Sequence, residues 1–153
     1  MLVLNNKEVL QVMDMKSCLD ALDKAAHALA TEDAIARPAT SVVMPRLGSE
    51  GLSGAYKLEN RDGIARPVKM AALRLMSDNH TFEKVPGGLL KRHKVPTALG
   101  QRYVGLVFLF DTETAQMVAI LPDGEIQRYR VAGTGALVSK YVARTDARTL
   151  GIL

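Results

Sequence analysis

The sequence has very few cysteine and aromatic residues. Of its 153 residues, one is a cysteine (Cys18), none is a tryptophan, and only 5% are aromatic. A single cysteine excludes an internal disulfide and is typical of a protein in a reducing compartment. Because Cys18 lies in an expected helix, we predict a buried, unreactive thiol there. The core must then be built mainly from aliphatic side chains and methionine.

Long hydrophobic runs are also missing. No apolar stretch approaches the roughly 18 residues that a membrane-spanning helix needs. No basic segment near the N-terminus leads into an apolar one, as it does in a secretory signal peptide. Together with the single cysteine, these features predict a cytoplasmic protein. With 48% hydrophobic and 24% charged residues, the composition is that of one ordinary globular domain.

The modest net charge of +4 is concentrated in one basic stretch. Lys84, the run Lys91-Arg92-His93-Lys94 and Arg102 lie close together in the sequence. Such a stretch can bind phosphate or nucleic acid, with affinity that falls steeply with salt. However, no aromatic residue for base stacking is interleaved with the run, and no nucleic-acid-binding motif surrounds it. We therefore interpret 91–94 as a solvated turn and expect no nucleic-acid partner.

Helical patterns dominate the first thirty residues. The apolar residues 2–4 predict a short strand, followed by a helix that Asn5 or Asn6 caps, with Glu8 in its first turn. From 15 to about 31, apolar residues recur every three or four positions, which predicts an amphipathic helix capped by Asp14.

The middle of the chain changes to strand patterns. Short β-prone segments bounded by Gly, Pro, Asp or Asn lie at 40–44, 54–58, 68–76, 103–110 and 117–121. The last two are joined by a short polar connection and predict a hairpin. A second helix is expected from about Arg130 to Arg144. The predicted fold class is α/β with α+β character: a mixed sheet flanked by two main helices.

The last nine residues have a different pattern. A charged turn leads into Thr149–Leu153, which is typical of the first strand of a parallel sheet. We expect residues 1–144 to form one domain and 145–153 to begin a truncated Rossmann domain, in which a Gly-rich turn would follow this strand. The sequence AGTGAL at 132–137 is not that turn, because it follows a polar stretch. We expect Gly133 and Gly135 to let a helix pack closely on a neighbour.

No catalytic group is evident from the motifs. His80 and His93 have no Cys or carboxylate at metal-ligand spacing, so we predict no metal site, and no nucleophile elbow occurs. The candidates that remain are cations at expected strand and helix ends. At the start of a helix, Arg130 would act with free backbone N–H groups to bind a carboxylate or phosphate, although a surface arginine is an equally open interpretation.

Three segments resemble the ornithine cyclodeaminase and mu-crystallin family. QRYRVAGTGALVSKYVARTDARTLGIL is similar to the family segment that reads Arg-Thr-Ala-Ala, a Ser/Ala-rich helix and an apolar strand entering a Gly-x-Gly-x-x turn. YVGLVFLFDTETAQMVAILPDG and VKMAALRLMSD look like the family's preceding hairpin and strand. The resemblance runs along nearly the whole chain, in the family's order, but covers only the N-terminal half of a family member.

The resemblance implies a substrate-binding and dimerisation domain, followed in the parent protein by a Rossmann domain that binds NAD or NADP. Family members act on amino acids or cyclic imino acids by hydride transfer at the α-carbon, as oxidoreductases or lyases. We therefore expect a homodimer with an amino-acid or imino-acid substrate. Because the cofactor domain lies beyond Leu153, we expect this chain alone to be inactive and to bind no cofactor tightly.

Residue by residue, Arg130 matches the Arg of the Arg-Thr-Ala-Ala motif, which lies between substrate and cofactor, and Val131 replaces the usual Thr. Arg74 falls where a Lys commonly faces the substrate, so a planar fork replaces a point charge. The family's carboxylate-binding Arg aligns with Ala39 or Thr40; either the nearby Arg37 substitutes for it or the clamp is absent. We thus expect Arg37, Arg74 and Arg130 to bind substrate, and Arg130 also to contact the cofactor.

A second hypothesis is a stand-alone, non-catalytic dimeric module that binds a small molecule in an anion pocket. Reading the coding sequence beyond Leu153 separates the two hypotheses. A Gly-x-Gly-x-x-Gly turn and a helix would favour the enzyme, whereas a stop codon would favour the module.

Overall fold

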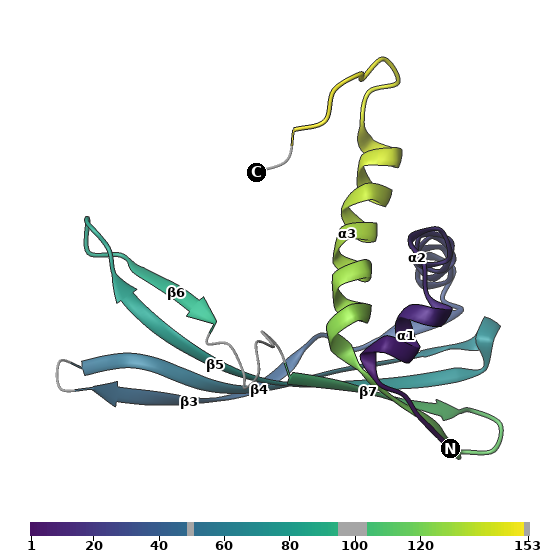
Figure 1. Cartoon of the computed structure of the whole chain (residues 1–153). Coiled ribbons are helices and arrows are strands. Elements are labelled where there is room, and N and C mark those ends of the chain that lie inside the picture. Colours follow the sequence, from purple (N-terminus) through teal and green to yellow (C-terminus); the bar gives the residue numbers. More distant parts are fainter. Residues whose placement is uncertain (49–50, 95–103, 152–153) are drawn as a thin grey trace.

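The protein folds as one mixed sheet with its helices on one face. The computed structural model describes residues 1–48, 51–94 and 104–151, and within them eight strands form a single sheet. The central order is β1-β8-β7-β5-β4-β2, with β3 paired to β4 and β6 paired to β5. Figure 1 shows the three helices on one side of this sheet, and within the described residues no helix lies on the other side. The predicted fold class, a mixed sheet with flanking helices, is confirmed.

The strands are longer than the sequence patterns predict. Their bounds are β1 (Leu2–Val3), β2 (Ala34–Ala36), β3 (Thr40–Gly48), β4 (Gly51–Ala65), β5 (Met70–Lys84), β6 (Leu90–Lys94), β7 (Val104–Asp111) and β8 (Met117–Pro122). Each of the five predicted segments contains a strand, although Val68 lies in the 3₁₀ helix Arg66–Val68 before β5 and Tyr103 lies outside the described residues; the β7–β8 hairpin is confirmed. β4 and β5 extend well beyond the predicted segments because charged side chains on one face alternate with apolar ones on the other, which weakens the hydrophobic signal. Among the strands of the described residues, β1 and β8 are the one pair that is parallel.

Two capping boxes start the N-terminal helices, as predicted. In α1 (Asn6–Val12), the Asn5 side chain accepts from the amides of Lys7 and Glu8, and the Glu8 carboxylate accepts from the Asn5 amide. In α2 (Met15–Ala30), Asp14 accepts from the Ser17 amide at 2.7 Å. That hydrogen bond lowers the pKa of Asp14.

The third helix begins earlier than predicted. α3 spans Asp123–Val142, with Pro122 at the N-cap and Asp123 and Glu125 in the first turn. A proline at a helix start and acidic residues in its first turn both favour this boundary, although Pro-Asp-Gly is also typical of a turn. Arg130 therefore lies about two turns inside the helix. The prediction that it acts with free N–H groups at a helix start is wrong.

Gly133 lets α3 approach α2 closely. A Cβ at Gly133 would lie 2.8 Å from Leu22 Cδ1 and 3.5 Å from Cys18 Sγ. The close-packing prediction is confirmed for Gly133, whereas Gly135 has nothing within 4 Å of its Cβ position. Cys18 is a buried free thiol, as predicted.

The basic run at 91–94 is a strand and not a turn. It forms most of β6, which pairs antiparallel with β5, and the intervening turn holds Gly87 and Gly88 at φ of 93° and 78°. The His93 ring lies 2.8 Å from the Glu83 carboxylate across the two strands. That cross-strand pair gives the run a sheet partner, which its composition did not reveal.

The predicted C-terminal strand is not formed over Thr149–Gly151, which have no regular secondary structure. Ile152 and Leu153 lie outside the described residues, so the proposed boundary at 144/145 stays a prediction. In the part of the chain that is described, no helix has the length and apolarity needed to span a membrane.

The two faces of the sheet differ sharply. Side chains alternate between faces along a strand, and paired residues share a face. The face without helices carries large apolar side chains that are exposed: Ile35, Val42, Met44, Leu58, Ile64 and Leu106. The helix-covered face carries a group of charged side chains, which forms the candidate site.

Candidate functional site

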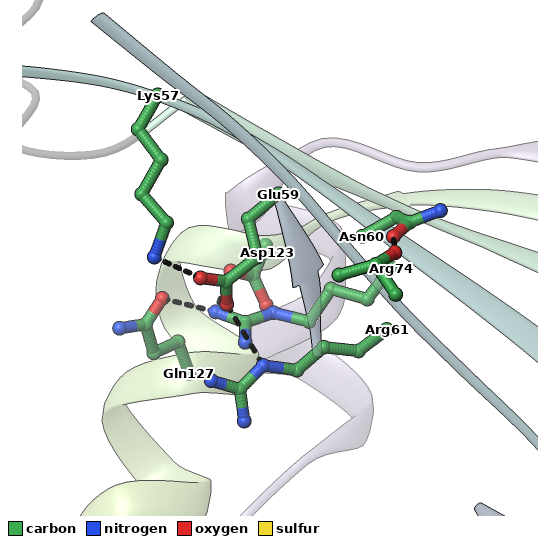
Figure 2. Close-up of polar contacts among 8 residues, drawn as sticks. Lys57, Glu59, Asn60, Arg61, Arg74, Asp123 and Gln127 are labelled. Carbon is green, nitrogen blue, oxygen red and sulfur yellow. Dashed lines mark hydrogen bonds and ion pairs between the residues drawn. The ribbon is translucent and has the colours of Figure 1, made fainter. Parts of the chain in front are cut away.

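A charged cluster lies on the helix-covered face, where β4, β5 and α3 meet. The strand register sets Arg61 directly opposite Arg74, and Glu59 and Lys57 follow on the same face of β4. Figure 2 shows these side chains gathered at the start of α3, close to Asp123 and Gln127. We call Lys57, Glu59, Arg61, Arg74, Asp123 and Arg130 the charged cluster.

Arg74 is held by the first turns of α3. Its Nη2 donates to Asp123 Oδ2 at 2.6 Å and to Gln127 Oε1 at 2.5 Å. The Arg74 side chain is 14% exposed and that of Asp123 only 1%. The Arg74 Nε is buried and has no hydrogen-bond partner among the described residues. The Arg74 Nε–H group is therefore a charged hydrogen-bond donor without an acceptor among the described residues.

A glycine on β7 brings α3 to this position. A Cβ at Gly105 would lie 2.9 Å from the Asp123 Cβ and 3.2 Å from the Leu75 carbonyl oxygen. Any larger residue would push the first turn of α3 away from the sheet. The Asp123–Arg74 ion pair thus depends on the absence of a side chain at Gly105.

Glu59 is a buried carboxylate shared by two cations. It accepts from Lys57 and, at 2.9 Å, from Arg61 Nε. The hydrogen bond from Lys57 lowers the pKa of Glu59; burial opposes the shift, and Arg61 adds to it. Glu59 is therefore ionised at neutral pH and helps to compensate the cations around it.

Arg130 lies two helical turns after Asp123 and is partly buried. Burial lowers the pKa of Arg130 first, followed by the positive charge of Arg74, and Asp123 opposes the shift. Within the described part of the chain, its guanidinium makes no hydrogen bond or ion pair. Asp123 is ion-paired with Arg74, so Arg130 has no carboxylate of its own among the described residues, and a partly buried cation of this kind suits an anionic ligand.

The structure does not bring Arg37 to the cluster. Its guanidinium forms a two-pronged pair with Asp62, at 2.8 and 2.5 Å, and is 61% exposed. Asp62 follows Arg61 in β4, so its side chain is on the opposite face. There, Arg37 and Asp62 line a shallow pocket of about 350 Å³ with Ile64 and Phe110. The expectation that Arg37 joins Arg74 and Arg130 in one carboxylate clamp is corrected by this placement.

The reason for the misplacement is local. Residues 37–39 lie between β2 and β3 and belong to neither, so strand alternation does not connect Arg37 with Thr40. Thr40 itself pairs with Asn60, on the same face as Asp62. The helix-covered cluster therefore receives nothing from this segment.

Sequence reasoning missed five residues of the site: Lys57, Glu59, Arg61, Asp123 and Gln127. The alternation Lys57, Glu59, Arg61 was a usable signal, because it marks one polar face of a strand that continues past 58. Asp123 was missed because the helix was expected to begin near Arg130, whereas α3 begins at Asp123. No local pattern links Gln127 to Arg74, 53 residues apart in sequence.

The cluster can bind and orient an anion. Arginine forks match the geometry of carboxylate and phosphate oxygens. No group of three or more His, Cys, Asp or Glu side chains in the described segments could hold a metal ion.

No protein-family model and no curated protein sequence matches this chain. Solved structures do match it. The chain resembles an archaeal alanine dehydrogenase, described as a dimer with bound NAD, with a TM-score of 0.69 and 19% identity over 95% of this chain and 38% of that one. It resembles Thermococcus litoralis Δ1-pyrroline-2-carboxylate reductase, in complex with NADH and L-proline, with a TM-score of 0.69 and 18% identity over 97% and 40%. A probable ornithine cyclodeaminase from Bordetella pertussis Tohama I gives 0.67 and 15% identity over 94% and 37%.

These likenesses confirm the resemblance at the level of the fold. The chain spans about 40% of the length of the structures that it matches. The sheet and helices described above are thus the fold that these NAD-linked and cyclodeaminase-type proteins contain over part of their length.

Proposed function

We propose that this chain is the substrate-binding part of an NAD(P)-linked, ornithine cyclodeaminase-like enzyme that acts on amino acids or cyclic imino acids. The observation that carries the proposal is the presence of two arginine groups on one face of this fold. The Arg74 Nε is buried and has no hydrogen-bond partner, and the Arg130 guanidinium makes no hydrogen bond or ion pair among the described residues. Structures with the same fold are described with NADH and L-proline or with NAD bound. A carboxylate is the anion that all amino and imino acids share.

In this proposal, Arg74 and Arg130 bind the substrate carboxylate and so fix the adjacent α-carbon. Asp123 and Gln127 hold the Arg74 guanidinium in place, so that its orientation is set before the ligand arrives. When bound, NAD(P) supplies or accepts the hydride at the α-carbon; on imine reduction the nitrogen gains a proton. In this proposal Arg130 also contacts the cofactor, because its guanidinium suits a phosphate or carboxylate oxygen.

The residues of this chain fit only part of a dinucleotide site. A free guanidinium at Arg130 suits an anionic group of a cofactor, but the sequence contains no Gly-x-Gly-x-x-Gly turn to hold a pyrophosphate. We therefore expect these 153 residues alone to bind NAD(P)H weakly and not to turn over substrate. Hydride transfer needs a dinucleotide-binding domain next to this one.

The partner of the chain is a second copy of itself. The proposal rests on the exposed apolar side chains of the sheet face that no helix covers, which include Val42, Met44 and Ile64. Large apolar side chains exposed on one face of a sheet are typical of protein–protein interfaces. The same face carries the Arg37–Asp62 pair, so Arg37 would lie in or beside that interface rather than at the substrate.

Isothermal titration calorimetry with pyrrole-2-carboxylate and its amide tests the carboxylate site. The two ligands have the same ring and differ in the negative charge, so the proposal predicts binding of the carboxylate and none of the amide. Arg130→Gln should abolish the difference. Arg128→Gln removes the same charge from the same helix, where Arg128 pairs with Glu125, and should leave it unchanged.

Two results would contradict the proposal. Equal binding of the carboxylate and the amide would show that there is no anion site. NADH-dependent imine reduction by the 153-residue chain alone would refute the proposal that a separate domain binds the cofactor. Carboxylate binding in a protein whose coding sequence holds no dinucleotide-binding segment would instead support the stand-alone module.

A further inference from the structure

The charged cluster holds more guanidinium donors than one carboxylate can use. Arg74 directs Nη2 at Asp123 and Gln127, and Arg61 directs Nε at Glu59. Within the described residues, the Arg61 Nη1 and Nη2 atoms and the whole Arg130 fork make no hydrogen bond. A carboxylate binds one guanidinium fork through its two oxygens. Two separate forks, at Arg61 and at Arg130, are thus open on the same side of the sheet.

The arrangement of like charges also points to a missing anion. Arg61 and Arg74 are cross-strand partners, a position at which two positive charges destabilise the sheet. Burial has the largest effect in lowering the pKa of Arg130. The positive charge of Arg74 lowers it further, and that of Arg61 has a smaller effect in the same direction. Three arginines therefore crowd one place, and only one of them, Arg74, has a carboxylate to itself.

The carboxylates nearby do not fill the two open forks. Glu59 is shared between Lys57 and Arg61, and Asp123 is taken by Arg74. Asp78 stands opposite Lys57 in the register, four residues along the strand from Arg61, or ~13 Å. It has interactions of its own, and it lies at the far end of the cluster from Arg130.

We propose that the ligand of this site carries two anionic groups, and that the substrate class is a small dicarboxylate amino or imino acid. The inference rests on the proposed function and narrows its substrate. The α-carboxylate binds at Arg74 and Arg130, and the second carboxylate binds the open Nη1/Nη2 edge of Arg61. Arg61 and Arg74 are cross-strand partners with side chains on the same face of the sheet, so we expect one small ligand to contact both.

Calorimetric titration of the 153-residue chain with succinate and with propionate, at low and constant ionic strength, tests this inference. Succinate presents two carboxylates and propionate one, and neither has an amino group. Succinate should bind ~10-fold tighter or more, since one additional charge-assisted bond contributes about a factor of ten or above. Inorganic pyrophosphate serves as a probe for a cofactor-type dianion.

Arg61→Gln separates the two subsites. Arg61 is 52% exposed, so its loss should leave the fold intact, which circular dichroism checks. The variant should bind succinate no more tightly than propionate. Arg61→Lys, which keeps the charge, should recover part of the preference. Arg128→Gln is the matched control and should keep the full preference.

The outcomes distinguish this inference from the proposed function. If succinate and propionate bind equally, or if Arg61→Gln keeps the succinate preference, the dicarboxylate inference is wrong and the carboxylate site stands. If pyrophosphate binds and succinate does not exceed propionate, the extra fork belongs to the cofactor and the inference is likewise overturned. If neither carboxylate binds, the proposed function fails as well.

Discussion

Replacing Asp123 with alanine removes the buried counter-ion of Arg74. The carboxylate is 1% exposed and the Arg74 side chain 14%, and their atoms are 2.6 Å apart. Removing one partner of a buried pair leaves an uncompensated charge and destabilises a protein by about 3–5 kcal/mol. Since α3 also loses an acidic residue from its first turn, we expect Asp123→Ala to fall in that range.

Urea denaturation at pH 7, followed by far-ultraviolet circular dichroism, measures this change in the free energy of unfolding. The equivalent thermal shift is a fall in Tm of roughly 6–20 °C for a protein of this size. Asp62→Ala is the control, because it breaks the exposed Arg37 pair on the opposite face, where ion pairs contribute little. If the two substitutions lower the free energy of unfolding by similar amounts, the buried ion pair contributes no more to stability than the exposed one, and the reasoning is refuted.

Three further predictions concern the helix contact, the buried glutamate and the open face. Gly105→Ala places a methyl group 2.9 Å from the Asp123 Cβ and should cost about 1–3 kcal/mol, measured by the same urea titration; no loss would show that α3 moves freely over β7. The pKa of Glu59 is lowered on folding, so the stability that it contributes is present above the usual glutamate pKa and is lost as pH falls through the lower folded value. Unfolding free energies measured from neutral to acidic pH should therefore decline less steeply for Glu59→Gln, and an unchanged slope contradicts the assignment. Val42 is 73% exposed on the apolar face, so the Val42→Glu substitution should disrupt the proposed homodimer. Analytical ultracentrifugation measures this, with Arg66→Gln as the control variant. An unsubstituted protein that sediments as a monomer would contradict the dimer.

The sequence patterns predict elements better than they predict their length or contacts. The capped helix at 15–31 is recovered within a residue because its apolar spacing, its Asp14 cap and its C-terminus agree. β4 and β5 are each 15 residues long, yet only their apolar parts are visible in the sequence. Charged residues at every second position read as loop unless both faces of the strand are considered together.

The site could be predicted only in part, for the same reason. Arg74 and Arg130 were found as cations at matching positions of a family pattern, but nothing local indicates that Arg74 meets Asp123, 49 residues away. That contact depends on the register of β5 with β7 and on the small residue Gly105. The error over Arg37 has a similar origin. The irregular residues 37–39, which lie between β2 and β3, determine the face of the sheet on which the Arg37 side chain lies.

The most direct test of the account observes the Arg74 Nε–H group itself. Nuclear magnetic resonance of the arginine Nε–H signals, assigned with Arg74→Lys and Arg37→Lys variants, can follow each guanidinium as pyrrole-2-carboxylate is added. The account predicts that the Arg74 signal shifts with the carboxylate and not with the amide, while the Arg37 signal stays unchanged. A shift of Arg37 without one of Arg74 would place the ligand on the other face of the sheet and contradict the central claim.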